Sequence, residues 1–560
     1  MFKKRLLAAA MSFALVLGIS GCANTKNTGN TENTEKTVNT NADAASTEAA
    51  STEASTGSQL ATEMVRVEAL DDNYRNYYEI FVRSYCDSNG DHIGDLNGVT
   101  SKLDYIADLG INGIWFMPVT QSTTYHKYDV VDYKSIDKEY GTMEDFDNLI
   151  EEAHKRGIRV IIDLVINHTS SQHEWFKTAC EYLKGLGDNE PDVSECKYFG
   201  YYNFAKEKVN GSYYNVPGTN WYYEGSFWSE MPDLNLKNET LMAEIKEIAD
   251  FWMEHGVDGF RMDAALHFEE GDTEKNTAIL NDLFTYCKEK NPNFYMVSEV
   301  WADQGTIASY YASLTPSMFN FAVSGGEGPI VKAGRGKYSA ERFVNTMVKS
   351  EETYSQENPE FIDAPFISNH DQPRVSNNLN GKTDDMKYAG GLLLSMGGSP
   401  FVYYGEEIGM ASSGQKDENK RLPMVWSKDD TTGITNAPTG ADKIEQDIDG
   451  VDKQLKDEGS LLNYYKKALR IRNENPEIAR GKTVIVESLT KDDQAAIIRT
   501  WNDKKIAVIY NTDDVSYEMD LKGTELENLK IVESLTCDGT SAELNGTKII
   551  LPARSIIYLK

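Results

Sequence analysis

The chain has 560 residues, more than one average domain holds, so two or three domains are expected. Hydrophobic residues make up 40% of it, which is enough for a large buried core. With 56 basic and 88 acidic residues the formal net charge is -32, which argues against a nucleic-acid-binding protein, because phosphates require a basic surface.

Residues 1–21 are predicted to be a lipoprotein signal peptide. A basic start, MFKK, precedes an apolar run, LLAAAMSFALVLGI, that is too short for a permanent membrane span. The residues from Ile19 to Cys22 read ISGC, which is similar to the bacterial lipobox, where cleavage precedes a cysteine that receives lipid. The alternative is an ordinary signal peptide followed by a chance cysteine.

Residues 22–72 are predicted to be a lipidated, disordered tether. The segment is rich in Thr, Asn, Ala, Ser and Glu and has almost no bulky apolar side chains, so it cannot bury a core. Lipid on Cys22 and a tether behind it predict a folded part on the extracellular side of the bacterial cell membrane, held there by the lipid anchor alone.

A (β/α)8 TIM barrel of the α/β class is predicted for residues 73–168 and 236–476. Short runs that are apolar on both faces alternate with amphipathic helical patterns, as in parallel sheets covered by helices. The eight strand candidates are 77–85, 111–119, 158–166, 257–264, 294–301, 318–324, 364–370 and 400–407. A doubly wound open sheet is the alternative, but eight units favour closure.

Two segments depart from this alternation. Residues 169–235 are aromatic and rich in Asn and Gly, which indicates a subdomain inserted after the third strand. Residues 477–560 show alternating strands with turn signals, which predict a C-terminal antiparallel β domain. The six cysteines lack metal-type spacing; Cys180 and Cys196 could pair or remain free thiols.

Polar side chains gather where the barrel strands are predicted to end. In barrel enzymes the active site lies at these carboxyl ends, so residues from different strands meet on one rim. The residues in question are Asp163, Asn167, His168, Arg261, Asp263, Glu299, His370 and Asp371.

Arg261 and Asp263 are two residues apart in a strand and therefore share a face. The guanidinium should keep Asp263 ionised, which makes it a nucleophile rather than a proton donor. Glu299 from the next strand can then act as the acid, provided that its surroundings raise its pKa. Two such carboxylates are the apparatus of glycoside hydrolysis, and a retaining enzyme holds them about 5–5.5 Å apart. A structural ion pair is the alternative for Arg261 and Asp263 alone.

Four segments resemble, in order, the signature segments of glycoside hydrolase family 13, the α-amylase family. They read DLVINH (163–168), GFRMDAALH (259–267), EVW (299–301) and FISNHD (366–371). Three further segments, GINGIWFMP (110–118), MPDLN (231–235) and GGSPFVYYGEE (397–407), look like its secondary ones. The resemblance covers about residues 73–560.

The resemblance implies a role for each catalytic residue. Asp263 attacks the anomeric carbon and forms a glycosyl-enzyme intermediate. Glu299 protonates the leaving oxygen and then deprotonates water, and Asp371 binds sugar hydroxyls and stabilises the transition state.

The resemblance also implies a substrate-binding group. Arg261 orients Asp263, and His168 and His370 bond to hydroxyls of the same sugar. Tyr128 matches the family's stacking tyrosine beneath that sugar, with His126 beside it.

The segment DSNGDHIGD, residues 87–95, is a candidate Ca²⁺ loop. Hard oxygen ligands at alternate positions suit Ca²⁺, although the terminal Glu of an EF-hand is missing. The candidate ligands are the side chains of Asp87, Asn89, Asp91 and Asp95 and the carbonyl of Ile93. A polar turn is the alternative. A second calcium site in the family would use Asn167 and Asp233.

The expected substrate is an α-1,4-glucan or malto-oligosaccharide, acted on by a monomer. Ala264 follows the nucleophile, where α-1,6-specific relatives tend to carry Val, and Leu266 replaces a Lys found in many α-amylases. The alternatives are an α-1,6-acting or transglycosylating relative, and a non-catalytic surface glucan-binding lipoprotein. A silent homologue would be expected to lack Asp263, Glu299 or Asp371, and all three are present.

Replacing the lipid acceptor tests the anchor. Cys22→Ser removes the acceptor thiol, so we expect the protein to move from the membrane fraction to the medium, as measured by fractionation and immunoblotting. A wild-type protein that is already wholly soluble would contradict the anchor.

Overall fold

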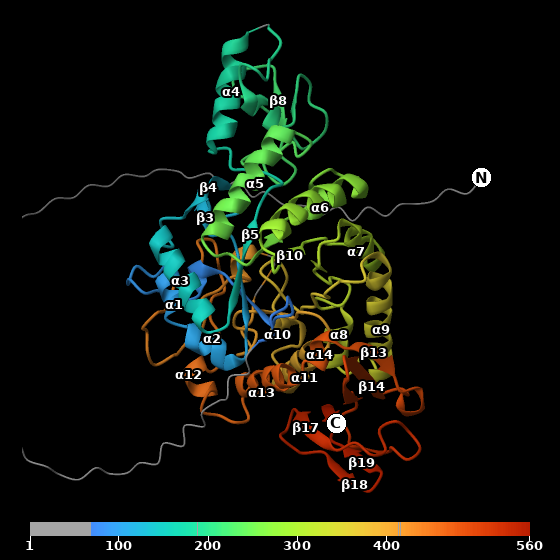
Figure 1. The fold of residues 1–560 in the computed structure, drawn as a ribbon. Coiled ribbons are helices and arrows are strands. Elements are labelled where there is room, and N and C mark those ends of the chain that lie inside the picture. Colours follow the sequence, from blue (N-terminus) through green and yellow to red (C-terminus); the bar gives the residue numbers. More distant parts are fainter. Residues whose placement is uncertain (1–68, 188, 413, 415) are drawn as a thin grey trace, which may run out of the picture. The chain divides into compact units, whose positions relative to one another are not determined.

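The computed structural model describes residues 69–560 except 188, 413 and 415, so the predicted signal peptide, Cys22 and all but the end of the tether lie outside the described residues. Seven parallel strands form the central sheet in the order β11-β10-β9-β5-β2-β1-β12 (Figure 1). They are β1 (Tyr77–Ile80), β2 (Gly113–Phe116), β5 (Arg159–Leu164), β9 (Gly259–Met262), β10 (Tyr295–Ser298), β11 (Ser317–Met318) and β12 (Phe401–Tyr403).

The seventh predicted strand, 364–370, is the one that does not form a regular strand. Only two isolated parallel bridges remain there, Phe319 to Ala364 and Phe366 to Phe401. Pro365 between them has no N–H to donate to a ladder, which limits the pairing. The two bridges still join the β11 side to β12, so the segment closes the ring and the fold is the predicted TIM barrel.

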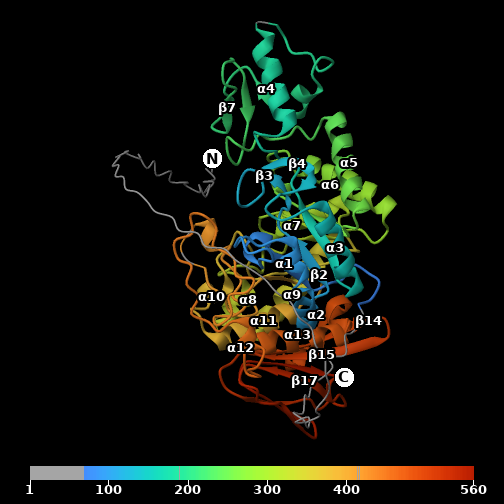
Figure 2. The ribbon, with the colours of Figure 1, turned by 90° about the vertical axis from the view of Figure 1, so that its left-hand side faces the viewer.

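Helices lie around the outside of the ring (Figures 1 and 2). They are α1 (Leu96–Thr100), α2 (Leu103–Leu109), α3 (Met143–Lys155), α5 (Glu239–Glu254), α6 (Thr273–Lys290), α7 (Gln304–Tyr310), α8 (Pro329–Gly334), α9 (Ala340–Glu357), α10 (Val375–Asn378), α11 (Thr383–Ser395), α12 (Val451–Gln454) and α13 (Leu461–Glu474). Thr142 caps α3 in a reciprocal bond with Asp145, as its sequence predicts. Asn238 caps α5 by accepting a hydrogen bond from the N–H of Leu241.

The interior of the barrel has an apolar layer below its polar rim. Side chains from all round the ring form one separate buried cluster, and Tyr77 stacks on Tyr295 and Phe401 within it. Next along β1 on the same face comes Glu79, so the interior changes from apolar to charged toward the carboxyl ends.

The insert after the third strand contains α4 (Glu174–Leu186) and a three-stranded sheet of β6 (Phe204–Ala205), β8 (Tyr222–Glu224) and β7 (Tyr213–Asn215). A hairpin of β3 (Thr120–Ser122) and β4 (Val130–Ile136) precedes it. An antiparallel bridge between His168 and Asp233 joins the two ends of the insert, so the insert leaves and returns at the end of the third strand.

The C-terminal domain is antiparallel, as predicted. One sheet has the order β13-β14-β15-β20-β17 and a smaller one the order β16-β19-β18. The strands are β13 (Lys482–Ile485), β14 (Gln494–Trp501), β15 (Lys504–Asn511), β16 (Tyr517–Asp520), β17 (Ile531–Thr536), β18 (Glu543–Asn545), β19 (Lys548–Leu551) and β20 (Ser555–Leu559), preceded by α14 (Glu477–Arg480). Hydrogen bonds from Ala340 to Thr512 and from Tyr510 to Ser395 attach the domain to α9 and α11.

All five cysteines that the structure describes are buried free thiols, so Cys180 and Cys196 are not paired. Residues 69–72, at the end of the predicted tether, already contact the barrel: Asp72 pairs with Arg75 and Arg480. In the part of the chain that the structure describes, no helix is both long and apolar enough to cross a bilayer.

Arg472 on α13 ties three parts of the barrel together. It is 2% exposed and donates to the carbonyls of Leu394 at 3.0 Å and Gly398 at 2.5 Å and to Asn76 Oδ1 at 2.8 Å. These contacts join α13 to the end of α11 and to the residue before β1. Burial lowers the pKa of Arg472 to about 9, because a charge without an acidic partner is costly to bury.

Arg472→Met should therefore destabilise the protein by roughly 3 kcal/mol or more, since several buried acceptors lose their donor at once. Arg470→Met is the matched control on the same helix, because Arg470 is 41% exposed and pairs at the surface with Glu474 and Glu533. Its cost should stay below about 1 kcal/mol. Denaturant unfolding measures both, and equal effects would contradict a special role for Arg472.

Candidate active site

The predicted site residues meet at the carboxyl ends of neighbouring strands. Asp163 lies on β5, Arg261 on β9 with Asp263 directly after it, and Glu299 directly after β10. Strand register sets the neighbours: Asp163 pairs with Arg261, which pairs with Val297 two residues before Glu299. The rim thus gathers groups from segments as far apart in the sequence as Asp163 and Glu299.

Arg261 is the hub of this rim. Its Nη1 contacts Asp163 Oδ1 at 2.5 Å and Asp263 Oδ1 at 2.6 Å, and its Nη2 contacts Glu299 Oε2 at 2.9 Å. The guanidinium is 1% exposed and lies 5.2 Å from the centre of the Trp115 ring and 5.8 Å from that of Tyr128. Arg261 and Asp263 share a face, as the strand period predicts, and both candidate carboxylates are held by one planar group.

The chain turns sharply after Asp263. Ala264 has φ 49°, in the left-handed region that a residue with a side chain rarely adopts. This turn aims the N–H of Ala264 at Glu299 Oε2, at 3.0 Å. Burial raises the pKa of Glu299 above its usual value, and Asp263 and Asp371 add to the rise while Arg261 opposes it. A raised pKa is what a general acid near neutral pH requires.

Asp371 has two cationic neighbours. His370 Nε2 lies 2.9 Å from its Oδ2, and Arg421 Nη2 lies 2.8 Å from its Oδ1. Burial disfavours the charged form, but these two cations outweigh it and lower the pKa of Asp371 below its usual range. Asp371 is therefore a carboxylate of fixed orientation beside Glu299.

The predicted sugar-binding residues surround this group. Tyr128 stacks on His370 with ring centroids 5.6 Å apart, and its hydroxyl bonds to His370 Nε2 and Asp163. His168 is 2% exposed, and its Nε2 has no hydrogen-bond partner in the part of the chain that the structure describes. A buried, unpaired ring nitrogen has a hydrogen bond left to make with a ligand. His126 bonds to Thr124 and lies beside Tyr128.

Several rim residues were missed by the sequence analysis. Glu79 on β1 bonds to His370 Nδ1 at 2.6 Å, and Arg421 comes from the irregular chain after β12, where no periodic pattern points to it. Phe227 from the insert contacts His168 and is 51% exposed. Trp301, two residues after Glu299, is 45% exposed and stacks on Phe321. For Glu79 the signal was present: it is an acid inside a strand that is otherwise buried and apolar.

The calcium-loop candidates adopt a tight turn. Asp87 accepts hydrogen bonds from the N–H groups of Asn89, Gly90 and His92, and Asp91 accepts one from Ile93. Asp95 also caps α1. The described residues contain no group of three or more His, Cys, Asp or Glu side chains arranged for a metal. For the second site, one oxygen of Asp233 is buried without a partner among the described residues.

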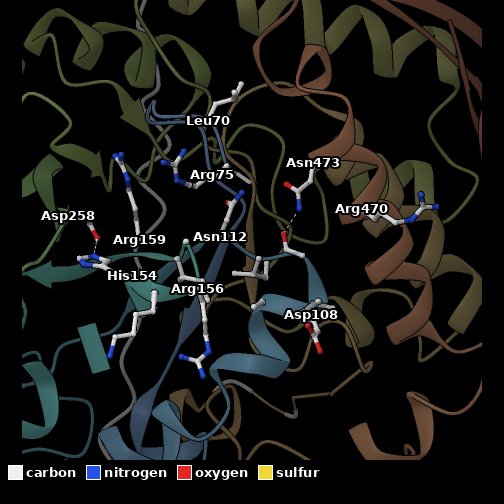
Figure 3. Close-up of a pocket in the computed structure, with 18 of the residues that line it drawn as sticks. Leu70, Arg75, Asp108, Asn112, His154, Arg156, Arg159, Asp258, Arg470 and Asn473 are labelled. Carbon is white, nitrogen blue, oxygen red and sulfur yellow. Dashed lines mark hydrogen bonds and ion pairs between the residues drawn. The ribbon is translucent and has the colours of Figure 1, made fainter. Parts of the chain in front are cut away.

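A hollow of about 620 Å³ lies at the other end of the barrel, where the strands begin (Figure 3). It is lined by Leu70 before β1, Asn112 before β2, Arg159 at the start of β5 and Asp258 before β9. None of the candidate catalytic residues lines it. Its basic groups are partly compensated, as in the pair of His154 with Asp258 at 2.8 Å.

Comparison with known proteins places the chain in a family. The alpha-amylase catalytic domain family matches residues 79–481. "Alpha-amylase 3" of Dictyoglomus thermophilum is 38% identical over 495 residues, which are 87% of this chain and 93% of that protein. "Glucan 1,6-alpha-glucosidase" of Streptococcus pneumoniae is 30% identical and covers 83% of this chain and 94% of that protein.

Among solved structures, Eubacterium rectale Amy13B superposes with a TM-score of 0.84 and 43% identity, and the match covers 88% of this chain and 96% of that one. The family match over residues 79–481 spans the insert and nearly all of the barrel, including the positions of Asp263, Glu299 and Asp371. The chain therefore belongs to the alpha-amylase family, glycoside hydrolase family 13, and is an α-glucan-active glycosidase.

Proposed function

We propose that the protein is a retaining hydrolase of α-1,4-glucosidic bonds in starch-type glucans or malto-oligosaccharides. The observation that carries this proposal is the contact of one buried guanidinium, Arg261, with both Asp263 and Glu299. The same cation limits how far apart the two carboxylates lie, and a short separation is what formation of a glycosyl-enzyme intermediate requires.

In the proposed reaction, Glu299 donates its proton to the glycosidic oxygen while Asp263 attacks the anomeric carbon. The leaving sugar departs as an alcohol, and the glycosyl group is bound as an ester to Asp263. Glu299, now ionised, takes a proton from water, which breaks the ester and restores both residues. Asp371 stabilises the positive charge that develops on the sugar ring in both steps.

The neighbouring side chains hold the sugar. The ring of Tyr128 is half-buried and offers an apolar face beneath it, while the free Nε2 of His168 is available for a hydroxyl. His126 and His370 complete the proposed binding group. Trp301 follows Glu299 by two residues and stacks on Phe321, and the leaving part of the substrate would pass along this pair.

The small side chain of Ala264 supports α-1,4 rather than α-1,6 specificity. The alternative is an α-1,6-acting or transglycosylating enzyme. It is supported by the relatives named as a glucan 1,6-alpha-glucosidase and a 4-alpha-glucanotransferase. A product profile on starch, pullulan and maltotriose distinguishes the alternatives. The intact group of Asp263, Glu299 and Asp371 argues against a non-catalytic glucan-binding protein.

Glu299→Gln and Asp263→Asn should separate the acid from the nucleophile. Glu299→Gln should lower α-1,4-glucan hydrolysis by about 10²–10⁴-fold or more, because glutamine cannot transfer a proton. On a glycosyl fluoride, whose leaving group needs little protonation, Asp263 should still attack and the covalent intermediate should accumulate. Asp263→Asn should abolish turnover of both substrates and trap nothing.

Mass spectrometry of the trapped adduct and rates on both substrates measure these effects. Glu289→Gln on the exposed surface of α6 is the control and should behave as wild type. An adduct on another residue, or near-normal starch turnover by Glu299→Gln, would overturn the assignment.

We also propose that residues 87–95 bind Ca²⁺ through Asp87, Asn89, Asp91, Ile93 and Asp95. The backbone N–H groups of the loop already converge on Asp87 and Asp91, and a carboxylate oxygen can bind a cation with a further lone pair. Bound Ca²⁺ would neutralise the repulsion between these carboxylates and brace the chain after β1.

A chelator should then lower the melting temperature, because an ion that binds only the folded state stabilises it by mass action. Asp91→Ala should remove most of this sensitivity. Asp538→Ala is the control, because Asp538 also accepts a bond from the N–H two residues on, but in the C-terminal domain. A melting temperature that does not respond to chelator would count against the site.

The lipid anchor on Cys22, the location outside the cell membrane and the monomeric state are proposals that rest on the sequence. The lipobox-like ISGC and the polar segment behind it support the first two.

A further inference from the structure

Glu79 is a buried acid at the catalytic rim to which the proposed reaction gives no role. It lies on β1 and is 1% exposed. Its Oε1 accepts hydrogen bonds from His370 Nδ1 at 2.6 Å and from the N–H of His370 at 3.3 Å. Among the described residues, His370 is its one ion-pair partner.

His370 is enclosed between two carboxylates. Its Nδ1 faces Glu79, and its Nε2 faces Asp371 Oδ2 at 2.9 Å and the hydroxyl of Tyr128 at 2.8 Å. An ionised carboxylate accepts hydrogen bonds and donates none. Both ring nitrogens must therefore carry protons to satisfy both carboxylates, which makes the ring an imidazolium.

The charges around His370 agree with this assignment. The hydroxyl of Tyr128, which bonds to His370, also donates to Asp163. The nearby cations are Arg261, beside the Tyr128 ring, and Arg421, whose Nε donates to the carbonyl of His370 at 3.2 Å. Burial opposes the charged ring, but Asp371 and Glu79 outweigh it and raise the pKa of His370 to about 9.

We propose that Glu79 is a positioning residue of the catalytic rim, which keeps His370 doubly protonated and thereby holds Asp371 as an oriented carboxylate. Asp371 depends on two cations, and Arg421 is a permanent one. The other, His370, is a cation only while protonated. Glu79 supplies the second negative charge that keeps the proton on the ring at and above neutral pH. This inference rests on the proposed function, because it gives Asp371 its role there.

The test is the pH dependence of kcat/KM for Glu79→Gln on α-maltosyl fluoride. This substrate needs little help from a general acid, so Glu299 does not set the basic limb of the profile. Glutamine keeps the shape of Glu79 and can still accept a hydrogen bond, but it lacks the charge. Loss of an opposite charge at this distance should lower the pKa of His370 by about 1–3 units.

We expect near wild-type kcat/KM at pH 5.5 and a basic limb moved to lower pH by about one unit or more. The basic limb moves to lower pH because the active form needs the protonated His370 ring. With a lowered pKa, the ring loses its proton at a lower pH. Glu407→Gln is the matched control: Glu407 is also fully buried but bonds to Tyr78 and Tyr105, and within the described part of the chain it bonds to no histidine. Its basic limb should not move.

A Glu79→Gln profile that falls by one factor at every pH, or that matches wild type, overturns the proposal. A wild type that does not turn over the fluoride at any pH contradicts the proposed function instead.

A direct measurement on the wild type does not depend on the folding of Glu79→Gln. The imidazole ¹⁵N shifts of ¹⁵N-histidine-labelled wild type, with the His370 signals assigned from His370→Asn, should show a doubly protonated ring at pH 7.5. A neutral ring overturns the proposal whatever the activity.

Discussion

The catalytic rim depends on a single buried cation. Arg261 contacts three carboxylates at 2.5 to 2.9 Å and is itself 1% exposed. Three acids brought this close would repel one another, and burial would drive protons onto them. The guanidinium is planar and always charged, so it opposes the rise in pKa that burial causes, which brings Asp163 to about 7 and Glu299 above its usual value. One residue thus holds three buried acids together at the rim.

The charged groups of the rim and the side chains that stabilise the fold occupy different layers of the barrel interior. Its lower part is an apolar cluster that includes stacked Tyr77, Tyr295 and Phe401, and its upper part carries the charges. Both parts are built from the same strands, two residues apart on one face. The apolar layer contributes the hydrophobic free energy that allows the charged layer to be buried at all. The strained backbone at Ala264 belongs to the charged layer, where strain is commonly found.

Local sequence patterns predicted the barrel, the insert, the C-terminal domain and the residues at the strand ends, because strand and helix periods are local properties. The pattern failed to give a regular strand at 364–370, because Pro365 has no N–H to donate to the ladder. It also missed Arg421, because its position beside Asp371 depends on how an irregular segment folds back. Glu79 was inside a predicted strand, but only the observed bond to His370 shows what a buried acid there does.

The described chain begins at the face where the strands start. Asp72 is bound there to Arg75 and Arg480, and Leu70 lines the hollow beside them. The catalytic residues lie at the opposite ends of the same strands. The segment that leads into the barrel therefore joins it on the non-catalytic side, and residues 69–72 take no part in the rim. A glucan that crosses the rim meets only side chains of the barrel and of the insert there, so those side chains set what the rim can accept.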